Sequence, residues 1–133
     1  MGVSASIDAY SSFLSGVIVI VRQEQMDRMG ASMQRGFEIR MVAYLRATFP
    51  QPTRQQTDDQ MTAFVRLGIS RARPYGITAE SDVQRYLEYM VMYGPEFDTS
   101  CAWASQILNT EGISGTKKMD WIDDYDQFIL NRS

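Results

Sequence analysis

The chain has 133 residues, of which 44% are hydrophobic and 22% are charged, and its formal net charge is −3. This length and composition are typical of one soluble globular domain and argue against a disordered chain. The sequence has no histidine and one cysteine, Cys101, so imidazole catalysis, an internal disulfide and a cysteine-rich zinc site are excluded. We therefore expect an interaction protein rather than an enzyme.

Residues 1–21 are predicted to form an extended N-terminal arm or tail. The apolar run from Val17 to Val21 is β-branched throughout and favours an extended conformation. It is much shorter than the roughly 20 residues that cross a bilayer, and no basic region precedes it, so neither a membrane span nor a secretory signal is expected. Ile18 and Ile20 are candidate partner contacts, because an extended arm can pair with a strand of another chain. A buried apolar arm or a disordered tail is the alternative.

Residues 22–133 are predicted to form one all-α domain, a compact bundle of five or six helices. Apolar residues at steps of three and four predict the first helix over residues 23–48. Pro50 and Pro52 end this helix, because a residue that precedes proline avoids the α conformation. The apolar stripe of the helix consists of Met26, Met29, Met33, Phe37, Met41, Tyr44 and Leu45.

Capping patterns mark the next two helices. Residues Thr57 to Gln60 have the form of a capping box, and Pro74 ends the helix that starts there. Thr78 is the candidate cap of the following helix, which is apolar on nearly every side and ends at Gly94. Such a helix is typical of the buried centre of a bundle. Its apolar residues are Val83, Tyr86, Leu87, Tyr89, Met90, Val91, Met92 and Tyr93.

Two shorter helices are expected in the remaining part of the chain. Asp98 is predicted to cap a helix over residues 100–108. The last helix is predicted to begin near Thr116, after a loop that contains two glycines. The last helix carries the apolar residues Trp121, Ile122, Tyr125, Phe128 and Ile129.

The last helix carries an acidic cluster. Asp120, Asp123 and Asp124 share one helix face, because they are separated by three or four residues. Their like charges repel, so a cationic partner surface would relieve them, and we interpret them as candidate partner contacts. A solvated acidic face and a site for Mg²⁺ or Ca²⁺ are the alternatives.

Arg71, Arg73 and Tyr75 form a polar turn between helices and are further candidate partner contacts. We expect Arg71 to pair with Asp82 or Glu80 in the helix that follows. The sequence has no phosphate-binding loop, no G-x-S-x-G motif and no nucleophile with a plausible base. We therefore assign no catalytic residue, no cofactor and no metal site.

Charge is distributed unevenly along the chain. Residues 22–73 hold nine basic residues and five acids, a balance of +4, whereas residues 74–133 hold four basic residues and ten acids, a balance of −6. The acidic total argues against a nucleic-acid binder. Two alternative functions remain open, namely a carboxylate–metal hydrolase on the three aspartates and a nucleic-acid-binding regulator. The regulator would use Arg35, Arg40, Arg46, Arg66, Arg71 and Arg73.

Short phrases along residues 22–130 form a further pattern. They include Glu24-Gln25-Met26, Tyr44-Leu45-Arg46, Phe49-Pro50, Val65-Arg66, Tyr75-Gly76-Ile77-Thr78-Ala79-Glu80, Arg85-Tyr86, Gly94-Pro95-Glu96-Phe97-Asp98 and Trp103-Ala104. Together these phrases resemble small helical bacterial proteins encoded beside type VI secretion spike and effector components. The resemblance implies a Gram-negative host and a role beside an effector, as an adaptor, a chaperone or an immunity protein.

We therefore expect a cytoplasmic, non-catalytic module whose partner is a protein, namely a secretion effector, a toxin or a spike component. Neither nucleic acid nor a membrane is expected as a partner. An immunity protein would block the toxin's site, often basic, with its own acids. An adaptor would instead cover an apolar segment of the effector during loading.

Overall fold

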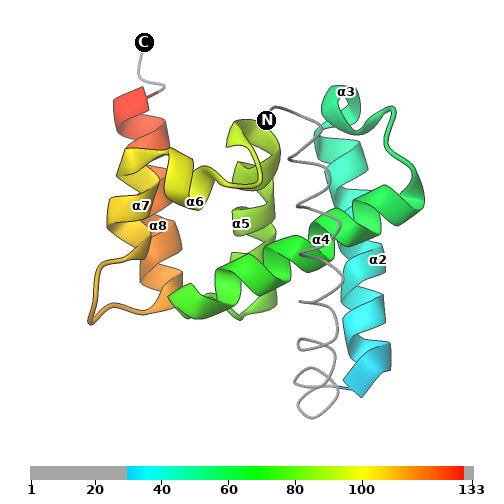
Figure 1. The fold of residues 1–133 in the computed structure, drawn as a ribbon, viewed down its shortest axis with the longest axis horizontal. Helices are drawn as coiled ribbons and strands as arrows, with labels where there is room; N and C mark the ends of the chain where they lie inside the picture. Colours follow the sequence, from blue (N-terminus) through cyan, green and yellow to red (C-terminus); the bar gives the residue numbers. More distant parts are fainter. Residues whose placement is uncertain (1–29, 131–133) are drawn as a thin grey trace. The chain divides into compact units, whose positions relative to one another are not determined.

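The computed structural model describes residues 30–130, and all regular structure in this range is helical. Seven α-helices, one short 3₁₀-helix and one π-helical segment follow one another (Figure 1). The predicted all-α class is therefore confirmed, with more helices than the five or six expected, because two of them are only four residues long. The predicted arm, with Ile18 and Ile20, lies outside the described residues, as does the predicted beginning of the first helix.

The chain divides into two compact units, and the division falls between Ser70 and Arg71. Each unit has its own helices and its own polar contacts, and each is described by itself below. The single domain expected over residues 22–133 stays a prediction.

The described part of the first unit contains α2 (Gly30–Thr48), α3 (Pro50–Thr53) and most of α4 (Asp58–Ala72). Phe37, Met41 and Leu45 are buried at intervals of four residues, as the apolar stripe predicted. Met33, one turn earlier, is 61% exposed, so the buried part of the stripe begins at Phe37. Helix α2 ends before Pro50, because proline restricts the residue that precedes it.

The predicted capping box at the start of α4 is confirmed. The Thr57 side-chain oxygen accepts a hydrogen bond from the Gln60 backbone N–H at 3.1 Å, and the Gln60 side chain accepts one from the Thr57 N–H at 2.8 Å. Arg46 fixes the loop before this helix, since it donates to the carbonyl oxygens of Thr53 and Gln56 and to the carboxylate of Asp58. Local sequence therefore determines where α4 begins.

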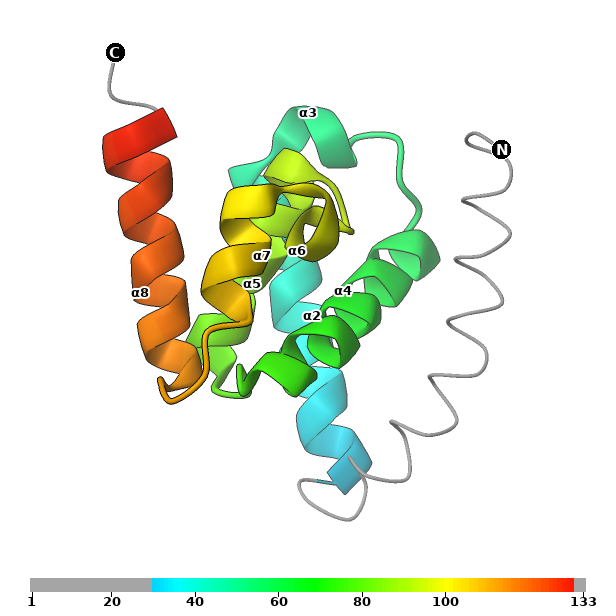
Figure 2. The ribbon, with the colours of Figure 1, turned by 60° about the vertical axis from the view of Figure 1, so that its left-hand side comes forward.

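The second unit contains α5 (Glu80–Tyr93), α6 (Phe97–Ser100), α7 (Ala102–Leu108) and α8 (Gly115–Tyr125). Helix α5 contacts both α6 and α8, and α7 lies alongside α8 (Figure 2). Four residues of the expected stripe, Val83, Tyr86, Leu87 and Met90, are buried, and the fifth, Val91, is half-buried. On the other faces Tyr89 is buried, Tyr93 is half-buried and Met92 is exposed. Helix α5 is therefore buried on most of its sides but not on all.

Two predicted helix caps are wrong. Residue Ala79, and not Thr78, occupies the cap position of α5, and its side chain makes no capping hydrogen bond. Glu96 precedes α6, and Asp98 lies inside that helix, where its side chain is buried. In this position the Asp98 carboxylate makes tertiary contacts that a sequence pattern cannot indicate.

The turn after the 3₁₀-helix η1 (Arg73–Tyr75) approaches the beginning of α8 very closely. Gly76 has a φ angle of +80°, which side chains other than glycine rarely adopt. A Cβ atom on Gly115 would lie 2.2 Å from the carbonyl oxygen of Gly76 and 2.9 Å from the Cα of Ile77. This contact between two backbones requires glycine at position 115. The Ser114 side chain caps the helix by accepting from the Lys117 N–H at 3.0 Å.

Candidate functional site

The largest group of exposed apolar side chains in the second unit lies on α8 and on the π-helical segment η2 (Asp126–Leu130) that continues it. Trp121 is 40% exposed, and Phe128, Ile129 and Leu130 are 60%, 53% and 43% exposed. Asp124 is exposed between them along the helix. We call these five residues the C-terminal face.

Of the five apolar residues that the sequence places on the last helix, Ile122 is buried, whereas Trp121, Phe128 and Ile129 are exposed. Helix α8 also buries Lys118 and Met119. Trp121 is adjacent to Ile122 in sequence, so the helical rotation of about 100° per residue turns it away from the core. Phe128 and Ile129 fall in η2, where π-helical bonding changes the angular spacing of successive side chains.

A single arginine joins the acidic cluster of α8 to α5. Arg85 donates through Nη1 to Asp120 at 3.0 Å and to Asp123 at 2.7 Å. Through Nη2 it donates to Asp82 of its own helix at 2.8 Å, and the Thr116 hydroxyl donates to the same carboxylate at 2.5 Å. Two of the three predicted aspartates therefore receive their cation from within the chain, whereas Asp124 is exposed and takes no part in this network.

Burial and hydrogen bonding oppose one another in this network. Burial favours the neutral forms, but the hydrogen bonds to Asp82, Asp123 and Asp120 raise the pKa of Arg85 above its ordinary value. Burial likewise acts to raise the pKa of Asp82, yet the bonds from Thr116 and Arg85 lower it below its ordinary value of 3.8. One guanidinium thus serves three carboxylates, which leaves a formal charge of −2 on this group.

Two tyrosines of α5 provide further links to the C-terminal part of the chain. The Tyr89 hydroxyl donates to Asp123 at 2.7 Å, and the Tyr93 hydroxyl donates to Asp126. Burial, together with the hydrogen bond to Asp123, raises the pKa of Tyr89, so this side chain remains a donor at physiological pH. These bonds attach α8 and η2 to α5 along their length.

The second candidate group, at the polar turn, is engaged inside the unit. Arg71 pairs with Asp98 at 2.5 Å, and the Tyr75 hydroxyl donates to the other oxygen of that carboxylate at 2.7 Å. The predicted pairing of Arg71 with Asp82 or Glu80 is therefore wrong, because α6 brings Asp98 closer than the start of α5. Burial and the bond to Asp98 raise the pKa of Tyr75 to about 12.

The polar turn has further internal contacts. Lys118 donates to the Tyr75 carbonyl oxygen at 3.1 Å, and its ammonium group lies 5.9 Å from the centre of the Tyr75 ring. Arg73 is half-buried and also has an interaction partner. We therefore interpret Arg71, Arg73 and Tyr75 as residues that hold the turn in place.

A chain of aromatic rings runs through the second unit and was not predicted from the sequence. Each ring contacts the next with centroids 4.9–6.5 Å apart, within or near the range of favourable aromatic pairs. The rings come from five separate segments, so periodicity within one helix could not reveal the series. In order they are Tyr75, Tyr86, Phe97, Tyr89, Tyr93, Trp103 and Tyr125.

The geometry does not favour either alternative function. Within residues 30–130, no three His, Cys, Asp or Glu side chains are grouped as a metal site would require. Asp120 and Asp123, proposed for a metal hydrolase, instead bind the Arg85 guanidinium. None of the helices in the same range is long and apolar enough to cross a membrane.

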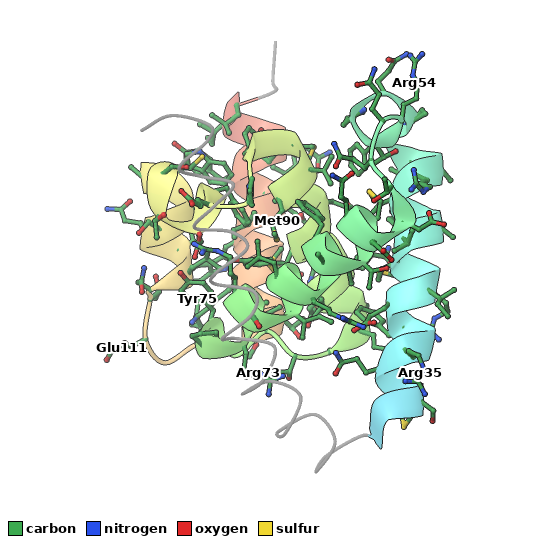
Figure 3. The ribbon with its side chains drawn as sticks, turned by 45° about the vertical axis from the view of Figure 1, so that its right-hand side comes forward. Arg35, Arg54, Arg73, Tyr75, Met90 and Glu111 are labelled. Carbon is green, nitrogen blue, oxygen red and sulfur yellow. The ribbon has the colours of Figure 1, made fainter. Side chains whose placement is uncertain are left out.

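Most of the arginines considered for nucleic-acid binding have partners inside the chain. Arg66 forms two hydrogen bonds with the buried carboxylate of Glu38, and Arg46 and Arg71 make the contacts given above. Arg40 and Arg73 also have interaction partners. Figure 3 shows Arg35 and Arg54 on the outer surface of the first unit. These contacts assign the basic residues largely to the stability of each unit.

Comparison with known proteins assigns no family to this chain. The sequence matches no protein-family model, no curated protein and no solved structure. The likeness to proteins of type VI secretion loci therefore depends on the sequence phrases alone.

Proposed function

We propose that this chain is a non-catalytic protein-interaction module that binds its partner through the C-terminal face. The observation that supports this proposal is the exposed apolar sequence Phe128-Ile129-Leu130, together with Trp121 about two turns earlier. A run of three exposed apolar residues is uncommon on the surface of an isolated protein and is typical of an interaction site. Burying one such side chain against a partner contributes about 1.5–3 kcal/mol.

The chemistry of the face also supports protein recognition. Tryptophan is enriched among the residues that dominate binding energy at protein interfaces, where it inserts into pockets of the partner. Asp124 places a charge beside the apolar side chains, as in interfaces that combine an apolar centre with a polar rim. Trp121 and Asp124 both lie on α8, which Arg85 and Tyr89 of α5 hold in place through Asp123.

On the basis of the sequence resemblance, we propose that the partner is a type VI secretion effector, toxin or spike component. The protein would act in the cytoplasm of a Gram-negative bacterium as an adaptor, a chaperone or an immunity protein. In this proposal residues 22–133 work as one helical bundle and residues 1–21 as an accessory arm. An adaptor or chaperone would cover an apolar effector segment with the C-terminal face, whereas an immunity protein would direct its acids at a basic toxin site.

Co-expression with the products of the neighbouring genes tests the proposal. We expect one of these products to co-purify with the wild-type chain and with Gln127→Glu, and its recovery to fall at least tenfold with Phe128→Glu. The two substitutions add the same charge at adjacent exposed positions, so only the loss of the apolar contact distinguishes them. Equal recovery with both variants, or no co-purifying product, would contradict the proposal.

Gene deletion separates the roles within this class. Self-intoxication of the deletion strain supports an immunity protein. Loss of effector secretion without toxicity supports an adaptor or a chaperone. A deletion strain that secretes normally and is not poisoned would contradict all three roles.

A further inference from the structure

We propose that the C-terminal face receives a basic amphipathic helix of the partner protein. In this arrangement the apolar side chains of the partner's helix contact Trp121 and Phe128, and the lysine or arginine side chains of that helix approach Asp124. This inference rests on the proposed function and specifies the chemistry of the partner.

The dimensions of the face suit a helix. Trp121 and Asp124 are three residues apart and therefore lie on one side of α8. From Trp121 to Leu130 the chain advances about 13 Å at the usual rise per residue, which corresponds to two to three helical turns. Recognition of an amphipathic helix uses apolar anchors repeated over such a distance.

The charge around the face favours a cationic partner. Arg85 serves three carboxylates and leaves a formal charge of −2, and exposed Asp124 adds another −1. Asp126 of η2, whose partner Tyr93 is neutral, adds a further −1, and exposed Lys117 of α8 brings the total to −3. Lys118 is buried and donates to the Tyr75 carbonyl oxygen.

The same charges disfavour two other occupants. A second copy of this chain, packed face to face, would bring acidic groups close to one another, and like charges facing each other cost several kcal/mol. A membrane with anionic lipids would repel the acidic rim.

Designed peptides test the inference directly. The probes are an amphipathic helical peptide of leucine and lysine, the same pattern with glutamate in place of lysine, and a leucine–lysine peptide of scrambled order. The chain has two tryptophans, so Trp103→Phe leaves Trp121 as the only indole reporter. Calorimetry with the wild-type chain measures the same affinities if Trp103→Phe weakens folding.

We expect the amphipathic lysine peptide to bind at least tenfold more tightly than either control peptide. Binding should move the Trp121 emission to shorter wavelength and protect the indole from acrylamide. Trp121→Ala should weaken binding at least tenfold and Asp124→Asn two- to fivefold, whereas Gln127→Ala, at a neighbouring exposed position, should change it less than twofold.

Three outcomes would overturn the inference: equal affinity for the lysine and glutamate peptides, equal affinity for the scrambled peptide, or binding that Trp121→Ala leaves unchanged. A dimer in sedimentation velocity that Phe128→Glu disperses would assign the face to a second copy instead. The proposed function has a separate test. If a co-expressed partner depends on Phe128 while the lysine peptide fails to bind, the function stands and only the helical, basic partner is wrong.

Discussion

Replacing Gly115 with alanine tests the close contact between the turn at Gly76 and the beginning of α8. The added Cβ would lie 2.2 Å from the Gly76 carbonyl oxygen and 2.6 Å from its carbonyl carbon. Ordinary contacts between such atoms exceed 3 Å, so one backbone must shift by about 1 Å, and overpacking of this kind costs about 1–3 kcal/mol. The Gly→Ala gain in helix propensity, at most about 1 kcal/mol, offsets only part of that cost.

The matched control is Gly36→Ala in the middle of α2. Its Cβ would meet only the Arg40 guanidinium, at 3.6 Å, which is an ordinary contact. We expect this substitution to raise the free energy of unfolding by about 0.5–1 kcal/mol, because alanine reduces the entropy of the unfolded chain. Urea unfolding followed by far-ultraviolet circular dichroism measures both variants. A Gly115→Ala protein as stable as the wild type would refute the reasoning.

Three further predictions concern single polar groups. Thr57→Ala removes half of the capping box and should lower the free energy of unfolding by about 0.5–2 kcal/mol in urea titrations, and an unchanged midpoint would count against the cap. Asp98→Asn leaves the largely buried Arg71 without its carboxylate and should lower the free energy of unfolding in urea titrations by about 3 kcal/mol. Tyr75→Phe removes one neutral donor and should lower it by only about 1 kcal/mol. Asp82 has a lowered pKa in the folded state, so its contribution to stability is complete above about pH 4 and is lost as the pH falls through the folded value. Acid titration of stability should therefore be flatter in Asp82→Asn, and an identical slope would contradict this assignment.

Features determined by neighbouring residues were predictable from the sequence. The capping box at Thr57 and the end of α5 before Gly94 were predicted correctly, because each depends on a few consecutive residues. The buried stripe of α5 was also predictable, since helical spacing places Val83 and Leu87 on one side.

Features that depend on tertiary contacts were not predictable. Asp98 resembles a helix cap in the sequence, but the fold brings it to Arg71 and Tyr75. The apolar residues of the last helix do not show which of them the fold covers, and Phe128, seven residues after exposed Trp121, is exposed as well. A hydrophobic pattern indicates which side chains favour burial, but not whether they are buried within the same chain or against a partner.

The network around Arg85 connects stability with recognition. Arg85 joins Asp120 and Asp123 of α8 to α5, and Tyr89 adds a second bond to Asp123. These contacts fix the helix that presents Trp121, so little ordering entropy remains to be lost when a partner binds. The same arginine cannot neutralise three carboxylates, which leaves negative charge beside the apolar side chains. Arg85 thus makes α8 rigid, while the carboxylates that it does not neutralise keep the C-terminal face acidic. Arg85→Gln should therefore weaken binding of a basic helix by loosening α8, despite making the face more negative.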